Sequence, residues 1–541
     1  MNKFLSLLRL LPALWLGASG LFAQWRPPVD PEGKVTLTTS TLPLILIDTH
    51  GRNIVDRPRI DADMKVIDHG VGALHTPQDS ANGYDGRIAI ELRGSSSQSY
   101  AKRQYRLETQ DSLGNNLNVS LLGLPEENDW ILNGPYSDET HLRNALAYRL
   151  SNKIGRYAPR TRYCEVIING DYRGIYLLVE KIKRDKNRVN IAKLDSADVQ
   201  GIALTGGYII KIDKTAGENV GGWTSARRQP YQYDYPKPNE IRPEQKAYIK
   251  DFIDRFEAAM YADWQVDRSF LDFIDLDSFV DHFILNEFCK NIDAYRISAY
   301  LYKDRDDRGG KLTAGPIWDF DLSMAKAFFP QDFGRYEGWQ LDYRQSHPTD
   351  GYQVPLWWEK LGHSDLFQER AVSRWQELRQ GALHIDSLYA EIDRLTAEIA
   401  EALPRNFQKY PAMLRGATYE AKLQELKEWI ANRLQWIDAH IGSLASAVET
   451  GEKPLTFRLE PNYPNPFNPT TTIAFSLAKK SRAVLEIFDL RGRSVEKLID
   501  GNFYPGDYQV TWRADAYPAG VYLYKLSAEG VTLQSKMTLI K

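Results

Sequence analysis

A proline-rich run near the C-terminal end constrains the fold of this chain more than any other feature. Pro461, Pro464, Pro466 and Pro469 lie close together. Each proline lacks a backbone N–H and clashes with a preceding helical turn, so the run excludes a helix. Helical periodicity precedes it and short alternating strands follow it. The chain therefore has separate parts, and we place a linker at 448–458.

The part after the linker, 459–541, has the pattern of a small β-sandwich. Turn residues such as Arg491-Gly492 and Pro505-Gly506 separate its apolar–polar runs at nearly regular spacing. A terminal sandwich is typical of a binding or handling module rather than a catalyst. The expected strands are Thr471–Leu477, Ala483–Phe488, Tyr508–Trp512, Val521–Leu526 and Gln534–Leu539.

The long part before the linker, 42–447, is predicted to be a mixed α/β body. Its apolar runs are short and β-branched, whereas 365–447 is helical throughout, and Asn169-Gly170 favours a tight hairpin. The expected strands are Leu42–Ile47, Arg87–Leu92, Gln104–Glu108, Tyr163–Ile168, Gly174–Glu180 and Tyr208–Ile212, and the expected helices are His141–Ile154, Pro243–Tyr261, Leu276–Phe288, Leu366–Leu378, Ile385–Ala402 and Tyr419–Leu444.

The N-terminal segment, residues 1–23, is predicted to be a cleavable signal peptide. Lys3 and Arg9 give it a positive start, and Leu10–Phe22 is almost wholly apolar. The apolar run is shorter than the ~20 residues that a membrane-spanning helix needs. An uncleaved anchor is the alternative. Residues 24–41 form a polar lead-in, and we expect an exported protein without a membrane span.

The composition argues against some classes of partner and bears on the state of the cysteines. The formal net charge of −3 provides no global field to attract nucleic acid or an anionic membrane. The hydrophobic fraction of 43% is sufficient for packed cores. The two cysteines, Cys164 and Cys289, lie in apolar contexts, which favours buried free thiols over a disulfide.

A cluster of acidic residues gives the clearest chemical signal. In an extended chain Asp319 and Asp321 point the same way, and two such carboxylates suit Mg²⁺ or Mn²⁺. Asp293 is placed to deprotonate a hydroxyl, and Asn291 to complete a metal shell. Alternatively, the acids cap turns and pair with Arg296 or Lys326. No Walker loop, dinucleotide fingerprint, zinc-protease helix or nucleophile elbow occurs, so an active site here is of an unusual type.

Two further segments have features of an anion site. The loop that begins Arg93-Gly94-Ser95 offers backbone N–H groups to an anion, and Lys102 adds positive charge. Glu180, at the end of an apolar strand, is placed to hold a phosphate-binding lysine. A plain hairpin loop and an ordinary edge salt bridge are the alternatives.

Taken in order, these motifs resemble the CotH kinase family over about Leu42 to Leu444. The resemblance implies an α+β, atypical protein-kinase-like body with an appended helical region. It also implies an enzyme that uses ATP and Mg²⁺ or Mn²⁺ to phosphorylate serine or threonine on surface or coat proteins. The motifs are Arg93-Gly94-Ser95, Lys102–Leu107, Leu124–Trp130, Leu142-Arg143-Asn144, Tyr157–Thr161, Asn169–Glu180 and Trp318–Asp321.

The same resemblance implies a role for each candidate residue. Lys102 is similar to the lysine that contacts phosphate and Glu180 to its ionic partner, and Asp293 resembles the catalytic-loop acid. The metal ligands correspond to Asn291, Asp319 and Asp321, and the reduced glycine-rich loop to Arg93, Gly94 and Ser95.

The C-terminal part resembles the type A sorting domain of the type IX secretion system. The likeness rests on Tyr463–Thr471, Ile487–Asp489 and Ala519–Tyr522. It implies an Ig-like sandwich, the type IX machinery as a partner, and a secreted or cell-surface location in a Gram-negative bacterium. The Ig-like domain of flagellar hook-cap proteins is a related interpretation.

Two functions remain open from the sequence. The first is an exported atypical Ser/Thr kinase that acts on a protein substrate. The second is a non-catalytic surface protein, adhesin- or coat-like, that keeps a kinase-like fold, because a fold alone does not fix a function.

Overall fold

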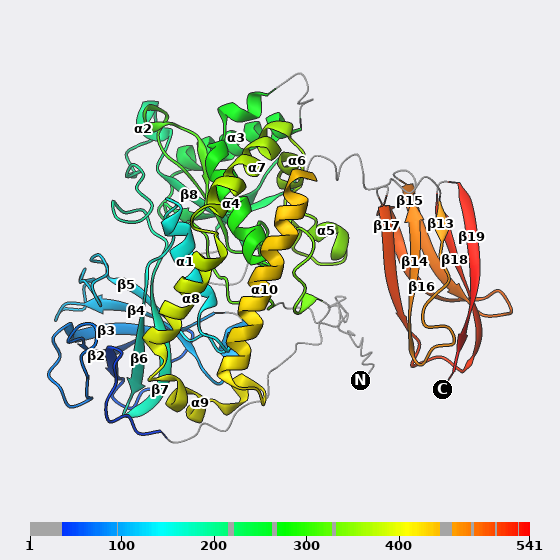
Figure 1. Ribbon diagram of the computed structural model, residues 1–541. Helices are drawn as coiled ribbons and strands as arrows, with labels where there is room; N and C mark the ends of the chain where they lie inside the picture. Colours follow the sequence, from blue (N-terminus) through cyan, green and yellow to red (C-terminus); the bar gives the residue numbers. More distant parts are fainter. Residues whose placement is uncertain are drawn as a thin grey trace, which may run out of the picture. The chain divides into compact units, whose positions relative to one another are not determined.

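The computed structural model describes residues 35–94, 96–214, 221–261, 268–326, 332–443, 457–477, 481–503, 506–528 and 530–540. The predicted signal peptide, most of the lead-in and linker, and Ser95 lie outside this part. Figure 1 shows the helices and strands of the chain. None of the described helices is long and apolar enough to cross a membrane.

The chain forms two compact units, each assembled from segments far apart in sequence. The first unit comprises the chain up to Tyr136, then Tyr163–Leu178 and Ile399–Ala417. The second comprises Ser137–Arg162, Val179–Glu398 and Thr418–Lys541. Strands β6 and β7 pass from one unit into the other along the chain.

A closed barrel forms the first unit, with the strand order β1-β2-β3-β4-β5-β7-β6. Strand β1 pairs antiparallel with β2 and parallel with β6, which closes the barrel. Its interior holds alternate apolar side chains of the strands, together with Trp130 and Cys164. The elements are β1 Leu44–Asp48, β2 Ile60–Ile67, β3 Tyr84–Arg93, η1 Ser96–Ser99, β4 Gln104–Gln110, β5 Asp129–Asn133, β6 Thr161–Ile168, β7 Asp171–Glu180, α9 Leu403–Lys409 and η5 Pro411–Leu414.

The predicted hairpin between β6 and β7 is confirmed. Asn169 and Gly170 form the two-residue turn, and both have positive φ, at 53° and 78°. Such turns follow the right-handed twist of the flanking strands, which is why Asn-Gly favours them.

The second unit begins with helix α1 and a sheet of order β12-β11-β8-β10-β9. Helix α4 lies next to β12 and α7, and its N-terminus is capped by Asp275, whose side chain accepts a hydrogen bond from Ser278 N. The elements are α1 Arg143–Lys153, α2 Gly201–Leu204, β8 Tyr208–Ile212, β9 Gly222–Thr224, β10 Pro230–Tyr235, α3 Pro243–Met260, η2 Ser269–Asp272, α4 Leu276–Cys289, β11 Ala299–Lys303, η3 Asp306–Arg308 and β12 Leu312–Ala314.

Helices dominate the rest of this body, as predicted. Thr418 caps α10 by accepting a hydrogen bond from Ala421 N. The helices are α5 Tyr343–Ser346, α6 Leu356–Gly362, α7 Asp365–Arg379, α8 Ile385–Ile399, α10 Tyr419–His440 and η6 Ile441–Ser443.

A buried ion pair joins α10 to the end of α4. The fully buried guanidinium of Arg433 contacts the Glu287 carboxylate at 3.3 Å, and it also donates to the Glu287 carbonyl at 2.6 Å and the Gly338 carbonyl at 2.8 Å. The Glu287 carboxylate accepts from the backbone N–H groups of Gln340 and Leu341 at 2.7 and 2.8 Å. Helix α10, the end of α4 and the segment 338–341 therefore meet at two buried charges.

Replacing Arg433 with Met should lower the free energy of unfolding by ~3–5 kcal/mol, because it leaves the Glu287 charge buried without its cation. Arg370 is a matched control, since its ion pair with Asp277 at 2.6 Å is largely exposed. Arg370→Met should cost at most about 1 kcal/mol. Urea unfolding of both variants measures the difference, and equal losses would contradict the expectation.

The C-terminal part forms two antiparallel sheets around one apolar core that includes Phe475 and Trp512. The sheets have the orders β13-β14-β17 and β16-β15-β18-β19. Strand β16 was not predicted from the sequence. The strands are β13 Arg458–Leu459, β14 Thr470–Leu477, β15 Ser481–Phe488, β16 Ser494–Phe503, β17 Gly506–Arg513, β18 Gly520–Ala528 and β19 Val531–Leu539.

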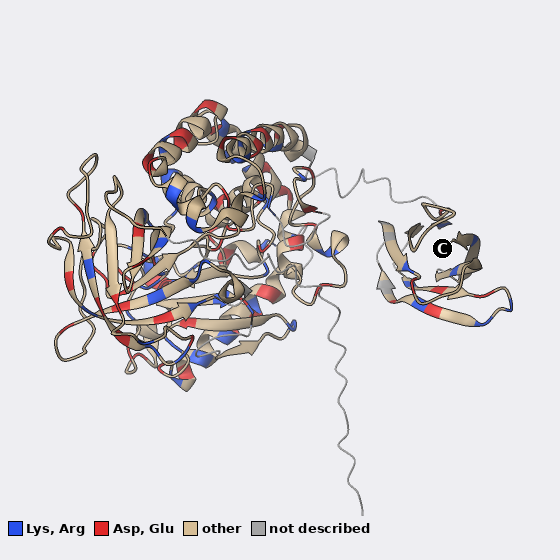
Figure 2. Ribbon diagram, turned by 90° about the horizontal axis from the view of Figure 1, so that it is seen from below, with Lys and Arg blue, Asp and Glu red and all other residues tan. Residues whose placement is uncertain are grey.

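The cysteine prediction agrees with the structure. Cys164 and Cys289 are both free and buried, which confirms the preferred interpretation. Figure 2 shows acidic and basic positions interspersed along the helices and strands rather than separated by sign.

Candidate functional site

The candidate acid Asp293 follows the end of helix α4. Lys290, the C-terminal cap, adopts a left-handed conformation with φ 46°, which turns the chain out of the helix. The buried Asn291 then accepts a hydrogen bond from Asp293 N at 3.2 Å through Oδ1. Its Nδ2 donates to Asn286 Oδ1 at 3.5 Å. These bonds fix Asn291 and Asp293 in a tight turn.

An arginine of the same turn holds the Asp293 carboxylate. Arg296 Nη2 lies 3.2 Å from Asp293 Oδ1, and its Nη1 lies 3.2 Å from Asp350 Oδ2. Burial raises the pKa of Asp293, and the Arg296 charge opposes that rise. The alternative that Asp293 pairs with Arg296 is therefore confirmed. A carboxylate with a raised pKa is also a stronger general base.

The two other candidate acids lie in a loop that follows β12. Asp319 has a positive φ of 61°, so the chain is not extended there. Contrary to the prediction, strand alternation therefore does not align Asp319 with Asp321. Strand β12 ends at Ala314, before Gly315 and Pro316. Asp321 is 9% exposed and accepts a hydrogen bond from Asn144 Nδ2.

Backbone hydrogen bonds join this loop to the end of α4. Met324 N donates to Cys289 O at 2.7 Å, and Ile292 N donates to Leu322 O at 3.4 Å. The segment with Asn291 and Asp293 therefore lies beside the segment with Asp319 and Asp321. Lys326, the alternative partner considered for these acids, forms an ion pair with Glu139.

The residues of this loop fit a hard divalent cation in their chemistry. Asp319 and Asp321 offer carboxylate oxygens, and Asn291 in the neighbouring segment offers an amide oxygen, the ligands that Mg²⁺ and Mn²⁺ prefer. Among the described residues, no group of three or more His, Cys, Asp and Glu side chains is arranged to hold a metal ion. Mg²⁺ sites commonly use only one or two carboxylates, with water and substrate phosphates as further ligands.

Lys102 lies in the first unit and is fully buried. Its ammonium donates to Asn406 Oδ1 at 2.8 Å and lies 5.2 and 5.5 Å from the ring centroids of Tyr176 and Tyr410. Burial lowers the pKa of Lys102 to about 7, although the nearby Glu165 raises it in part. Near neutral pH this lysine is therefore only partly charged.

The loop ahead of Lys102 is the predicted anion loop. Arg93 Nη1 donates to Gln104 Oε1 at 3.1 Å. Gly94 has φ 107°, and a Cβ at this position would clash with Ser97 Oγ. This positive φ favours glycine at the position.

Glu180 ends β7 in the second unit, and its side chain is fully buried. Arg160 binds it with two hydrogen bonds of 2.8 Å, and Arg188 Nη2 lies 3.2 Å from Oε1. Tyr157 donates to Oε2 at 3.4 Å. The arginine pairing matches the salt-bridge alternative, and a role of Glu180 toward Lys102 stays a prediction.

These features define a mixed α/β body with a buried acid next to a loop of oxygen donors, joined to an all-β C-terminal part. The chain belongs to the CotH kinase protein family, which matches residues 90–437. Residues 462–541 match the secretion system C-terminal sorting domain, which indicates a secreted or cell-surface protein. Both resemblances seen in the sequence are thereby confirmed. No match is found among curated proteins.

Ser298, five residues after Asp293, was not singled out from the sequence. It has φ 52°, and its N–H donates to Asp213 Oδ1 at 3.4 Å.

Proposed function

We propose that this protein is an exported atypical protein kinase that transfers the γ-phosphate of ATP to serine or threonine of surface or secreted proteins. The observation that carries the proposal is the pairing of the Asn291–Asp293 segment with the Asp319–Asp321 loop through backbone hydrogen bonds. Phosphoryl transfer needs a base and metal-binding carboxylates near one another, and few other parts. Export by the type IX system of a Gram-negative envelope, after removal of residues 1–23, belongs to the same proposal.

Each residue has a distinct task in this proposal. Asp293 accepts the proton of the attacking hydroxyl, and its raised pKa favours that transfer. Asp319 and Asp321, with Asn291, would hold Mg²⁺ or Mn²⁺. When bound, the cation neutralises charge on the phosphate oxygens. By the family resemblance, Lys102 and the Arg93–Ser95 loop are proposed for phosphate contacts and Glu180 as a supporting acid.

The test is phosphate transfer by the purified mature chain. We expect labelled ATP with Mn²⁺ or Mg²⁺ to label the chain itself or a co-purified surface protein. ATP with metal should also raise the melting temperature, because a ligand that binds only the native state stabilises it. An Asp319→Asn, Asp321→Asn variant should lose both effects while it stays folded. Labelling that persists in this variant would contradict the proposal.

A second candidate is a non-catalytic surface protein. The ion pair between Asp293 and Arg296 favours it, because a paired carboxylate also suits a purely structural role. In that case the double variant keeps the surface phenotype of the parent chain. A lost phenotype with intact folding would exclude this candidate.

A further inference from the structure

Helix α1 holds the Asp319–Asp321 loop at three successive residues. Tyr148 Oη accepts a hydrogen bond from Asp319 N at 3.0 Å, and Asn144 Oδ1 accepts one from Phe320 N at 2.7 Å. Asn144 Nδ2 donates to Asp321 Oδ1. One turn of helix therefore contacts the backbone of Asp319 and the carboxylate of Asp321.

Packing supports the same contact. The Tyr148 ring stacks on Trp318 at a centroid distance of 6.0 Å, and Phe320 meets it edge-on at 6.4 Å. Phe320 and Asn144 are 1% and 6% exposed. The Tyr148 ring is thus held between the two aromatic residues that flank Asp319, and its hydroxyl reaches the amide between them.

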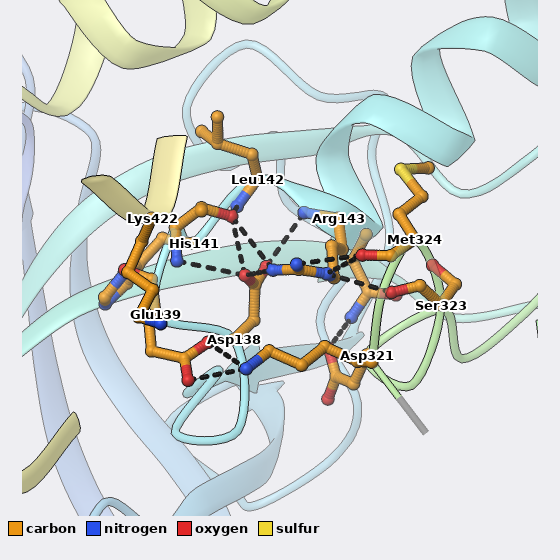
Figure 3. A network of polar contacts seen from close by, with 12 residues as sticks. Asp138, Glu139, His141, Leu142, Arg143, Asp321, Ser323, Met324 and Lys422 are labelled. Carbon is orange, nitrogen blue, oxygen red and sulfur yellow. Dashed lines mark hydrogen bonds and ion pairs between the residues drawn. The ribbon is translucent and has the colours of Figure 1, made fainter. Parts of the chain in front are cut away.

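A charged network extends this contact to the far end of the loop, as Figure 3 shows. Arg143 donates from Nε to Ser323 O and from Nη2 to Met324 O, each at 2.9 Å. Asp138 binds the same guanidinium and accepts from Arg143 N at 2.8 Å. Lys326, where the described loop ends, pairs with Glu139.

The backbone of the loop requires such support. Asp319, Met324 and Ala325 have φ values of 61°, 47° and 75°, a region that residues other than glycine rarely adopt. Strained backbone persists only where the surroundings hold it, and it clusters at functional sites. The contacts from α1 fall on or next to each strained residue.

We propose that Asn144 and Tyr148 are positioning residues that set the geometry of Asp319 and Asp321, so that helix α1 controls the metal affinity of the loop. This inference rests on the proposed function. Partners that orient a metal-binding carboxylate typically change metal affinity 10–100-fold when removed. Asn144 orients the Asp321 carboxylate directly, whereas Tyr148 acts through the Asp319 backbone.

Mn²⁺ binding to the full chain tests this role without any need for turnover. Electron paramagnetic resonance measures free Mn²⁺ in the presence of a non-hydrolysable ATP analogue. Asn144→Ala should weaken Mn²⁺ binding about 10–100-fold, and Tyr148→Phe several-fold. Asn152→Ala is the matched control on the same helix, because the Asn152 side chain bonds to Tyr148 O and Ala158 O, not to the loop. It should bind Mn²⁺ like the parent chain.

Hydrogen exchange supplies a second measurement if Asn144→Ala folds poorly. Tyr148→Phe keeps the ring and removes the acceptor for Asp319 N, so this amide should exchange faster while the strands of the sheet stay protected. Unchanged exchange at the loop would overturn the inference.

The outcomes separate this inference from the proposed function. If Asp321→Asn loses Mn²⁺ and Asn144→Ala binds it like the parent, only the positioning role is overturned. If the parent chain binds no Mn²⁺, or Asp319→Asn and Asp321→Asn bind it unchanged, the proposed function is overturned together with the inference. Weakened binding in the Asn144 and Tyr148 variants alone supports the positioning role.

Discussion

Replacement of Asp293 by Asn should lower the rate of phosphate transfer by about 10²–10⁴-fold, the range that a general base contributes. An amide keeps the shape of the side chain and removes its ability to take up a proton. Mn²⁺ and nucleotide binding should stay close to those of the parent chain, because the Asp319–Asp321 loop is untouched. Single-turnover transfer of labelled phosphate measures the effect.

The neighbouring Asp350 provides the matched control. Its Oδ2 contacts the same guanidinium of Arg296 at the same 3.2 Å distance. Asp350→Asn therefore weakens the other ion pair of Arg296 without removing the base, and it should change the rate only slightly. If both variants lose activity equally, the activity depends on the ion pairs of Arg296 and not on Asp293 as a base.

The dependence of the transfer rate on pH is an independent test of Asp293 as the base. Burial raises the pKa of Asp293, so the fraction of ionised base falls as pH drops through a value above that of an ordinary aspartate. The parent chain should show this acid limb in its rate profile, and Asp293→Asn should lack it. A profile without an acid limb in the parent chain would argue against Asp293 as the base.

Lys102→Met should make the protein more stable at pH 7 and abolish the contacts proposed for ATP phosphate. Burial lowers the pKa of Lys102 from 10.5 to about 7. Between these values the unfolded chain binds a proton that the folded chain does not, so stability rises with pH by up to about 1.4 kcal/mol per unit. The penalty at pH 7 amounts to ~4 kcal/mol.

Methionine removes this penalty and fills a similar volume. Asn406 Oδ1 also accepts Ile175 N at 3.1 Å, so it stays hydrogen-bonded when the lysine is lost. The stability gained by Lys102→Met should shrink steadily from pH 7 toward pH 10, as measured by urea unfolding. A gain that does not change with pH would contradict the lowered pKa.

The combination of greater stability and lost activity would identify a functional lysine. Residues kept at a cost in stability are typical of active sites. If Lys102 is purely structural, its replacement should instead destabilise the protein. The free energy lost with the hydrogen bond to Asn406 would then exceed the free energy gained by removing the buried charge.

Local patterns in the sequence predicted most of the secondary structure. Tyr208–Ile212 coincides with β8, and the Asn169-Gly170 turn joins two strands as expected. In both cases the signal depends on adjacent residues. Strand β16, Ser494–Phe503, was missed because its charged residues and Gly501 blur the alternation of apolar and polar positions.

The remainder depends on contacts between distant residues. Closure of the barrel needs the parallel pairing of β1 with β6, for instance Ile45 with Val166, which no local pattern encodes. Lys102 bonds to Asn406, 304 residues away, so its burial was not predictable from its loop. The left-handed Asp319 owes its conformation to α1, and the sequence of its own loop suggests a strand instead.

The three-segment construction of the first unit has a consequence for the timing of folding. A chain that is synthesised from its N-terminus cannot complete the first unit until Ile399–Ala417 has been made. Contacts of such long sequence separation form slowly, because a long loop must close before they contribute. During synthesis or export, Lys102 therefore lacks its hydrogen-bond acceptor Asn406 until that late segment is present. A chain truncated before α9 should be sensitive to protease rather than fold as a smaller domain.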